Sequence, residues 1–358
     1  MGYEYISLSD ILRSELGVTE KARTELQDAG NQIRDEKGYD YLAQKAIEHI
    51  DNSTHNKFVV DSIRNTHEVD ALQRKYASFY LFAVWASKEK RWERISTRYD
   101  GNLALFEKDD KRDQSEKNEN GQQITLCYLM ADIIIINNQV IHSPAAEEFT
   151  NLSGITKHYI SLIERTESFV PSEMETLMTM AYANSMRSSC LQRKVGALII
   201  DNKGNVFSSG YNEVPSSEKT CRSEYGMCYR RFLKDDIGKT INSEFSDAET
   251  ANKVFGVISG KFKNLDHCRA LHAEENAIVN MAKCGVTVNF GSATLYTTTY
   301  PCNLCANKIA QVGIKTVVYY EPYPQKEAKS ILSAHKVNQI PFEGVTYNGY
   351  FRFREVLR

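Results

Sequence analysis

Four residues in the second half of the sequence have the types and spacing of a metal-assisted hydrolytic site. His272 and Glu274 stand two positions apart, and Cys302 and Cys305 follow about 30 residues later, directly after Pro301. Imidazole nitrogen and thiolate are ligands that zinc prefers, and three protein ligands leave a fourth position for water. We predict a catalytic zinc held by His272, Cys302 and Cys305, which lowers the pKa of such a water towards about 7.

The two halves of this motif are each expected at the start of a helix. Backbone N–H groups and the helix dipole favour thiolate over thiol there. The spacing of Cys302 and Cys305 places both sulfurs on one helical face, and Pro301 suits a helix start. A closed structural zinc is the alternative, but it normally has four protein ligands and gives no reason for Glu274, which is placed for proton transfer.

The order H-x-E and then P-C-x-x-C is the signature of zinc-dependent deaminases. Residues 174–324 resemble the deoxycytidylate deaminase family, and four segments carry the resemblance: Cys190–Ala197, Gly210–Asn212, His272–Ala277 and Leu295–Cys305. The resemblance implies a cytidine-deaminase-like α/β fold, a mixed sheet with flanking helices. It also implies hydrolytic deamination of deoxycytidine nucleotides, dCTP or dCMP, to deoxyuridine nucleotides.

The resemblance assigns two further site residues. In the family, the asparagine of a Gly-Tyr-Asn segment holds the sugar hydroxyl, which gives this role to Asn212. A turn asparagine that follows a strand is the alternative. Arg193 is expected to contact a phosphate or an effector, and a structural role at a strand edge is its alternative.

Three segments are similar to one branch of the family, the bacterial anti-phage deoxycytidine nucleotide deaminases: Gly210–Pro215, Glu321–Pro324 and Pro341–Val345. That branch depletes the nucleotide pool during phage infection. Members of the family commonly form oligomers, and some are kept inactive by a regulatory RNA or another inhibitor. The resemblance therefore implies a homo-oligomer and a regulator of this kind as partners.

The first half of the chain is similar to the P-loop kinase-like domain of the same branch, at Gly2–Leu12, Val59–Val69 and Gly121–Asn137. No G-x-x-x-x-G-K-[ST] loop occurs in the sequence, so kinase activity is not supported. Either the start has been truncated or the domain serves regulation or assembly. We expect a P-loop kinase-like domain without its Walker A loop at 1–150 and the deaminase domain at 165–358.

Composition narrows the function classes. The chain has 358 residues, enough for two domains of ordinary size, and a net charge of −2, which argues against binding to duplex DNA. Deamination of a base in RNA or single-stranded DNA is an alternative function, but it predicts a basic and aromatic surface that does not stand out. A non-catalytic nucleotide sensor is another, against which Glu274 argues.

The compartment and the membrane question also follow from the sequence. Residues 1–10 lack a signal-peptide pattern. Eight cysteines in a chain without such a signal indicate a reducing, cytoplasmic location. The longest apolar run, within 131–136, is too short to span a bilayer, so no membrane association is expected.

A second, structural zinc is a further hypothesis. Cys221, Cys228, His267 and Cys268 have the composition of such a site, although unrelated thiols in a loop-rich region are the alternative. The remaining cysteines outside the catalytic motif are predicted to be buried thiols: Cys127, Cys190 and Cys284.

Hydrophobic patterning gives the expected elements. In the first half, strands at 57–61, 79–85 and 131–137 alternate with helices and predict a parallel sheet, and the polar segment 108–121 reads as a solvated loop or lid. In the second half we expect a helix at 172–190, a hairpin of 195–201 and 205–211, helices from 272 and 302, and strands at 293–299 and 316–321. The insertion 234–266 lacks periodicity.

Overall fold

The computed structural model describes residues 2–17, 23–114, 121–139, 147–261, 268–285, 290–322 and 326–354. It divides into two compact units, one of Met1–Pro171 with Glu343–Arg358 and the other of Ser172–Phe342. This grouping differs from the expected domains at the C-terminal end. Residues after Phe342 belong to the first unit, because β10 (Gly344–Val345) pairs antiparallel with β4 (Ile133–Ile136).

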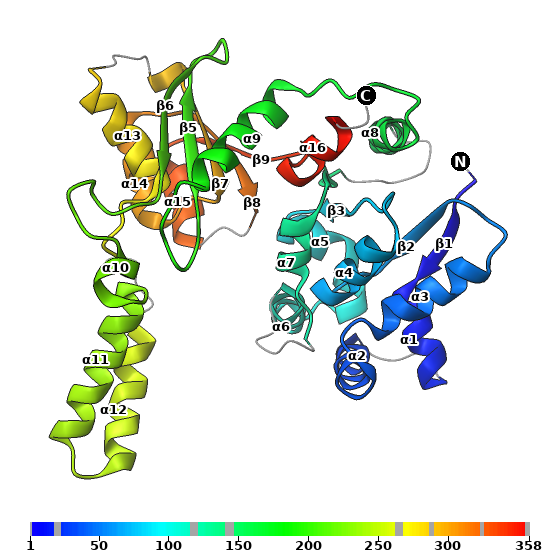
Figure 1. The fold of residues 1–358 in the computed structure, drawn as a ribbon, viewed down its shortest axis with the longest axis horizontal. Coiled ribbons are helices and arrows are strands. Elements are labelled where there is room, and N and C mark those ends of the chain that lie inside the picture. Colours follow the sequence, from blue (N-terminus) through cyan, green and yellow to red (C-terminus); the bar gives the residue numbers. More distant parts are fainter. Residues whose placement is uncertain are drawn as a thin grey trace. The chain divides into compact units, whose positions relative to one another are not determined.

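The second unit is built on a five-stranded mixed sheet of order β6-β5-β7-β8-β9 (Figure 1). Its strands are β5 (Gly196–Ile200), β6 (Val206–Tyr211), β7 (Thr294–Thr299), β8 (Thr316–Glu321) and β9 (Asn338–Pro341). The β5–β6 and β5–β7 pairs are antiparallel, whereas β7–β8 and β8–β9 are parallel. The predicted hairpin and the two later strands are confirmed.

Helices cover both faces of this sheet. The helices α13 (Ala273–Lys283), α14 (Asn303–Val312) and α15 (Lys326–Ala334) share one buried core with Ala197, Leu295 and Val317. Alternate strand residues face the opposite side. There α9 (Glu173–Ser185) packs so closely on β5 that a Cβ at Gly196 would lie 1.9 Å from the Ala181 carbonyl oxygen. The expected mixed sheet with flanking helices is therefore confirmed.

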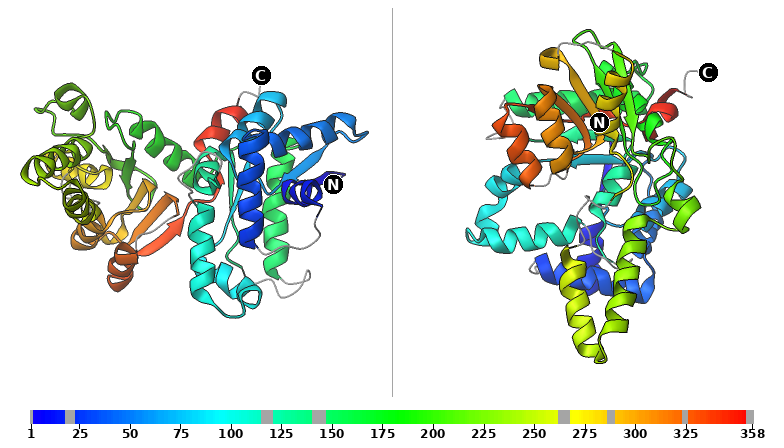
Figure 2. Two further views of the ribbon diagram at one scale, coloured as in Figure 1. Left: turned by 90° about the horizontal axis from the view of Figure 1, so that it is seen from below. Right: turned by 90° about the vertical axis from the view of Figure 1, so that its left-hand side faces the viewer.

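The insertion between β6 and α13 is helical. It contains α10 (Cys221–Tyr225), α11 (Tyr229–Glu244) and α12 (Ala248–Lys261), and α11 and α12 lie side by side, extending away from the sheet of their unit (Figures 1 and 2). Most described residues of the segment 234–266, whose sequence lacks periodicity, are therefore helical. Its residues are mostly exposed, with Ile241 and Ala251 among the few buried ones. A helical pair with little core gives only a weak apolar pattern.

The first unit contains a parallel pair, β1 (Glu4–Ser7) with β2 (Phe58–Asp61), and a three-stranded sheet in which β4 lies between β3 (Phe82–Trp85) and β10. The three strands predicted here are confirmed. The prediction of a single parallel sheet is wrong, because these strands form two sheets. In one of them β10, from the far end of the chain, runs antiparallel to β4. Residues so distant in sequence leave no local signal of their pairing.

Helices surround these strands: α1 (Leu8–Leu16), α2 (Arg23–Lys37), α3 (Tyr41–Asn52), α4 (Thr66–Lys75), α5 (Lys88–Ile95), η1 (Ser96–Tyr99), α6 (Leu103–Gln114), α7 (Ile124–Met130), α8 (Glu147–Ile163) and α16 (Tyr347–Arg354). The predicted loop at 108–121 is thus helical up to Gln114, and residues 115–120 lie outside the described part. Asp109, Asp110 and Asp113 are buried there. Arg91 pairs with Asp110, and the Gln27 amide donates to Asp113 over 2.5 Å. Buried carboxylates are tolerated when they have partners of this kind. A charged segment can therefore form a packed helix, although its charge alone predicts a solvated loop.

In the described part of the chain, no helix combines the length and the apolar character needed to cross a membrane.

Candidate metal and catalytic site

The predicted zinc ligands converge at the first turns of two neighbouring helices. His272 is the N-cap of α13 and Cys302 is the N-cap of α14. The Nδ1 atom of His272 lies 3.3 Å from the Sγ atom of Cys302 and 3.3 Å from that of Cys305. These donor atoms all lie within 4.8 Å of one another, and no other group of three potential ligands among the described residues converges this closely.

The position of α13 is fixed by its contact with β6. A Cβ at Gly210 would lie 2.1 Å from the Ala273 carbonyl oxygen and 2.4 Å from the Ala277 nitrogen, so only glycine allows this approach. The side-chain amide of Asn276 donates to the Tyr211 carbonyl oxygen over 2.7 Å, and that of Asn280 donates to Ser209 over 2.9 Å. The strand therefore holds the helix start that carries His272 and Glu274.

Glu274 is almost fully buried, with 2% of its surface exposed. Burial raises the pKa of its carboxyl above the ordinary value, while His272 and the Cys305 thiol act in the opposite direction. The carboxyl adjoins both ligand residues, as a group that exchanges protons at the metal must. The pattern H-x-E thus places a buried carboxyl beside the predicted ligands, and its role as a proton carrier stays a prediction.

Of the two cysteines beside the imidazole, Cys302 is the more readily ionised. A hydrogen bond from the Cys305 thiol lowers the pKa of Cys302 to about 4, and His272 adds to the shift. Contact with Cys302 raises the pKa of the His272 ring. One imidazole nitrogen and two sulfurs, one of them readily ionised, form a donor set that fits zinc.

Asn212 and Arg193 lie at the edge of the same region, and both make structural contacts. The buried Asn212 accepts from the Val195 backbone N–H over 2.7 Å and donates to the Arg193 carbonyl oxygen over 2.8 Å. Arg193 forms an ion pair with Glu321 at the end of β8. These contacts are the ones expected of a turn asparagine and of an arginine with a structural role at a strand edge. The substrate roles of both residues stay predictions.

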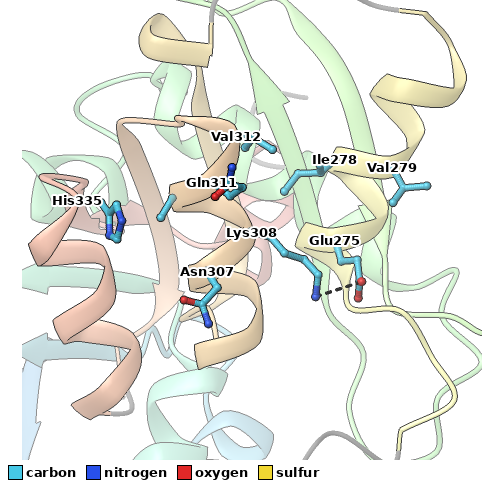
Figure 3. A pocket seen from close by; sticks show the side chains of 9 residues that line it. Glu275, Ile278, Val279, Asn307, Lys308, Gln311, Val312 and His335 are labelled. Atoms are coloured by element: carbon cyan, nitrogen blue, oxygen red, sulfur yellow. Dashed lines mark ion pairs between the residues drawn. The ribbon is translucent and has the colours of Figure 1, made fainter.

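Two pockets adjoin the start of α13. One of about 240 Å³ is lined by His272, Glu275 and Lys308 together with the segment 268–271. Another of about 590 Å³ lies between α13 and α14, where Lys308 pairs with Glu275 over 3.2 Å (Figure 3). Because the pocket in Figure 3 contains none of the four motif residues, we regard the one that reaches His272 as the better candidate for the site.

Four cysteines gather around a separate, small cavity of about 20 Å³: Cys190, Cys221, Cys228 and Cys268. Burial raises the pKa of the Cys268 thiol, and the nearby Cys190 and Cys228 raise it further. His267, which the second-zinc hypothesis included, lies outside the described residues. Cys190 was missed as a member because its neighbours in sequence give no ligand spacing.

The cysteines predicted to be buried thiols differ from one another. Cys127 is buried as expected, and this burial raises its pKa to about 12. The prediction is wrong for Cys190, which is half-buried at the cysteine cavity, and for Cys284, which is exposed at the end of α13. Helix ends expose side chains that a helical interior would bury, and the sequence alone places such ends poorly.

Comparison with known proteins agrees with this geometry. Residues 171–321 match the family model of the cytidine and deoxycytidylate deaminase zinc-binding region. A deoxycytidylate deaminase of Schizosaccharomyces pombe is 35% identical over 179 residues, which are 48% of this chain and 46% of that protein. One of Mycobacterium phage D29 is 32% identical over 149 residues, which are 42% of this chain and 94% of that protein.

A solved structure is also similar: the dCMP deaminase of cyanophage S-TIM5 in complex with dCMP and dUMP is 27% identical, covers 49% of this chain and 99% of its own, and has a TM-score of 0.34. The chain spans less than half the length of the two yeast relatives, 46% for Schizosaccharomyces pombe and 40% for Saccharomyces cerevisiae. The phage relative, by contrast, is matched along nearly its whole length. The chain belongs to the deoxycytidylate deaminase family, and its zinc-binding deaminase region implies zinc as a cofactor.

Proposed function

We propose that this protein hydrolyses the exocyclic amine of a free deoxycytidine nucleotide, dCMP or dCTP, so that water enters and ammonia leaves. The observation that carries the proposal is the convergence of the His272 nitrogen and the Cys302 and Cys305 sulfurs beside the buried Glu274. Several relatives carry the name deoxycytidylate deaminase, which supports dCMP as substrate. The dCTP activity rests on the sequence resemblance alone.

His272, Cys302 and Cys305 would hold the metal. Zinc bound there supplies an activated water at neutral pH. Glu274 takes a proton from the attacking water, delivers one to the ring nitrogen N3 and later protonates the departing amine. Its raised pKa suits this work, because a carboxyl that binds protons more tightly is a better acceptor for the proton of the water.

Asn212 and Arg193 are the proposed substrate contacts. The Asn212 amide has a second N–H and a second acceptor lone pair beyond its backbone hydrogen bonds, which suffice for a sugar hydroxyl. Arg193 is half exposed beside Glu321, so its guanidinium can also reach a phosphate. In this arrangement the backbone contacts of both residues orient them for the nucleotide.

A structural zinc at the cysteine cavity is part of the proposal, with Cys190 added to Cys221, Cys228 and Cys268. Its support is that four thiols from separate segments line one cavity. Their sulfurs do not converge as closely as the catalytic donors, so a metal would have to draw them together.

The biological setting is also proposed. Depletion of deoxycytidine nucleotides during phage infection, assembly into a homo-oligomer, control by a regulatory RNA or another inhibitor, and a cytoplasmic location all rest on the sequence resemblance or the cysteine content. A P-loop kinase-like origin of the first unit has the same basis.

The substrate is tested by incubating the zinc-loaded full chain with dCMP, dCTP, cytidine and a cytosine-containing oligonucleotide, and measuring ammonia and uracil product. The Glu274→Gln variant, checked for the same zinc content, is the control. Conversion of dCMP or dCTP by the wild type alone is the expected result. Reaction of the oligonucleotide alone would establish polynucleotide editing instead, and no reaction with zinc bound would favour a sensor.

A further inference from the structure

The segment 268–271 leads directly into the predicted zinc ligand His272. It lies in neither a helix nor a strand, apart from a single β-bridge at its last residue. His272 itself is an N-cap with an extended backbone, φ −73° and ψ 160°, so the helix α13 holds it from one side only. The placement of the His272 ring therefore depends also on what holds the segment before it.

One contact of this segment is made by the backbone of Leu271. Its N–H donates to the Glu213 carbonyl oxygen over 2.9 Å, and the Glu213 N–H donates back to the Leu271 carbonyl oxygen over 3.2 Å. The Glu213 carboxylate in turn accepts from the backbone N–H and the hydroxyl of Ser189 over 2.7 and 2.6 Å. This bridge holds Leu271 beside the end of β6, but it does not fix the residues before Leu271.

The second contact is made by the side chain of Arg269. Its guanidinium donates through one nitrogen to Glu224 over 2.5 Å and through another to Glu218 over 3.0 Å. These carboxylates lie 45 and 51 residues earlier in the chain, where the helical insertion begins. Arg269 stands where the insertion ends, so its side chain joins the two ends of the insertion that contains α10, α11 and α12.

Two aromatic rings complete the surroundings of this guanidinium. The Cζ atom of Arg269 lies 5.3 Å from the ring centre of Tyr225 and 5.9 Å from that of Tyr229, and the two ring centres are 5.0 Å apart. The Arg269 side chain is 19% exposed. Single exposed ion pairs contribute little to stability, but a planar cation that meets two carboxylates and two rings is held in one orientation.

We propose that Arg269 is a positioning residue for the metal site. It holds the segment 268–271 in the course that brings the His272 nitrogen to the two cysteine sulfurs. Removal of groups that orient metal ligands typically weakens metal binding or activity by about 10- to 100-fold. The role of Arg269 rests on the proposed zinc site and assigns to it a residue that is not itself a ligand.

The role is tested by measuring metal affinity in the full chain. Zinc-free wild type, Arg269→Gln and Arg269→Lys are titrated with zinc against a chromogenic chelator, and with Co²⁺, whose visible absorption reports the coordination geometry. Each titration is repeated with Cys302→Ser added, and only the metal equivalent that this substitution removes is assigned to the site at His272. Arg231→Gln is the matched control, because Arg231 is an exposed arginine of α11 outside the contacts of Arg269.

We expect Arg269→Gln to weaken metal binding at the Cys302-dependent site about tenfold and to change its Co²⁺ spectrum. Arg231→Gln should change neither. Arg269→Lys should restore only part of the affinity, because one ammonium group cannot reproduce a planar fork that reaches two carboxylates. Glu224→Gln added to Arg269→Gln should weaken binding little further, since the two side chains act as a pair.

Metal binding like that of the wild type in Arg269→Gln, shown by circular dichroism to be folded, would overturn the proposal. A lower melting temperature with unaltered affinity and Co²⁺ spectrum would also overturn it, because Arg269 would then support only the insertion. If Arg269→Gln does not fold, the double variant Glu218→Gln/Glu224→Gln removes the same ion pairs, and the same outcomes decide. A wild type without any Cys302-dependent equivalent would instead refute the zinc site itself, and this role with it.

Discussion

Two cysteine-containing regions of the second unit can be compared directly. At the catalytic motif, His272 and Cys302 are N-caps of helices packed on the sheet, and their donor atoms meet within 4.8 Å. At the cysteine cavity, Cys190 and Cys268 lie in irregular segments and Cys221 starts a five-residue helix. The difference shows that a site is pre-organised when each ligand is placed by an element that itself packs in the core.

The largest expected effect breaks the catalytic side of this comparison. Glu274→Gln removes the proton carrier and keeps the shape, so we expect kcat for the deaminated nucleotide to fall by about 10²- to 10⁴-fold. Zinc content, measured by atomic emission, should stay at the wild-type value. Loss of the metal together with the activity would show instead that Glu274 maintains the ligand set.

The second prediction concerns the close approach that positions the ligands. Gly210→Ala places a methyl group against Ala273 and Ala277 backbone atoms, so β6 and α13 must separate. We expect a loss of about 1–3 kcal/mol in the free energy of unfolding, with a lower kcat because Glu274 moves with the helix. Thermal and urea unfolding measure the first effect and ammonia release the second.

Gly256→Ala is the matched control for that experiment. Gly256 lies within α12, and no atom stands within 4 Å of a Cβ built there. Alanine at an exposed helical position should stabilise the protein by about 0.4–1 kcal/mol. Equal effects of the two substitutions would contradict the account of Gly210.

Sequence reasoning succeeded where local patterns determine the structure. The motif around His272 and Cys302 predicted two helix starts and a set of converging ligands, because a helix N-terminus and a three-residue spacing are local properties. It failed where the outcome depends on distant partners. The pairing of β10 with β4 and the burial of Asp110 by Arg91 both join segments whose relation no local pattern records.

The third prediction sharpens the comparison at the cysteine cavity. If that cavity holds a structural zinc, Cys190→Ser should lower the zinc content by about one equivalent and reduce the melting temperature, because a structural metal contributes folding energy. Cys284→Ser, at an exposed position, should change neither. An unaltered zinc content in Cys190→Ser would remove the structural zinc from the proposal.

The smallest effect separates exposed from buried thiols. Cys284 is exposed, whereas burial raises the pKa of Cys127 to about 12. Because the thiolate is the reactive form, N-ethylmaleimide should modify Cys284 within minutes and leave Cys127 unmodified until the protein unfolds. Peptide mass spectrometry after timed quenching measures both rates, and early labelling of Cys127 would show that α7 opens in the native state.

The central claim is that His272, Cys302 and Cys305 hold a zinc on which deamination of a free deoxycytidine nucleotide depends. The most direct test removes zinc from the full chain with a chelator, restores it stepwise, and follows metal content and ammonia release from dCMP and dCTP in the wild type and Cys302→Ser. The account predicts that activity on at least one nucleotide returns in proportion to zinc in the wild type, and that Cys302→Ser neither regains activity nor binds this equivalent of metal. Full activity of the zinc-free wild type, or of Cys302→Ser, would contradict it.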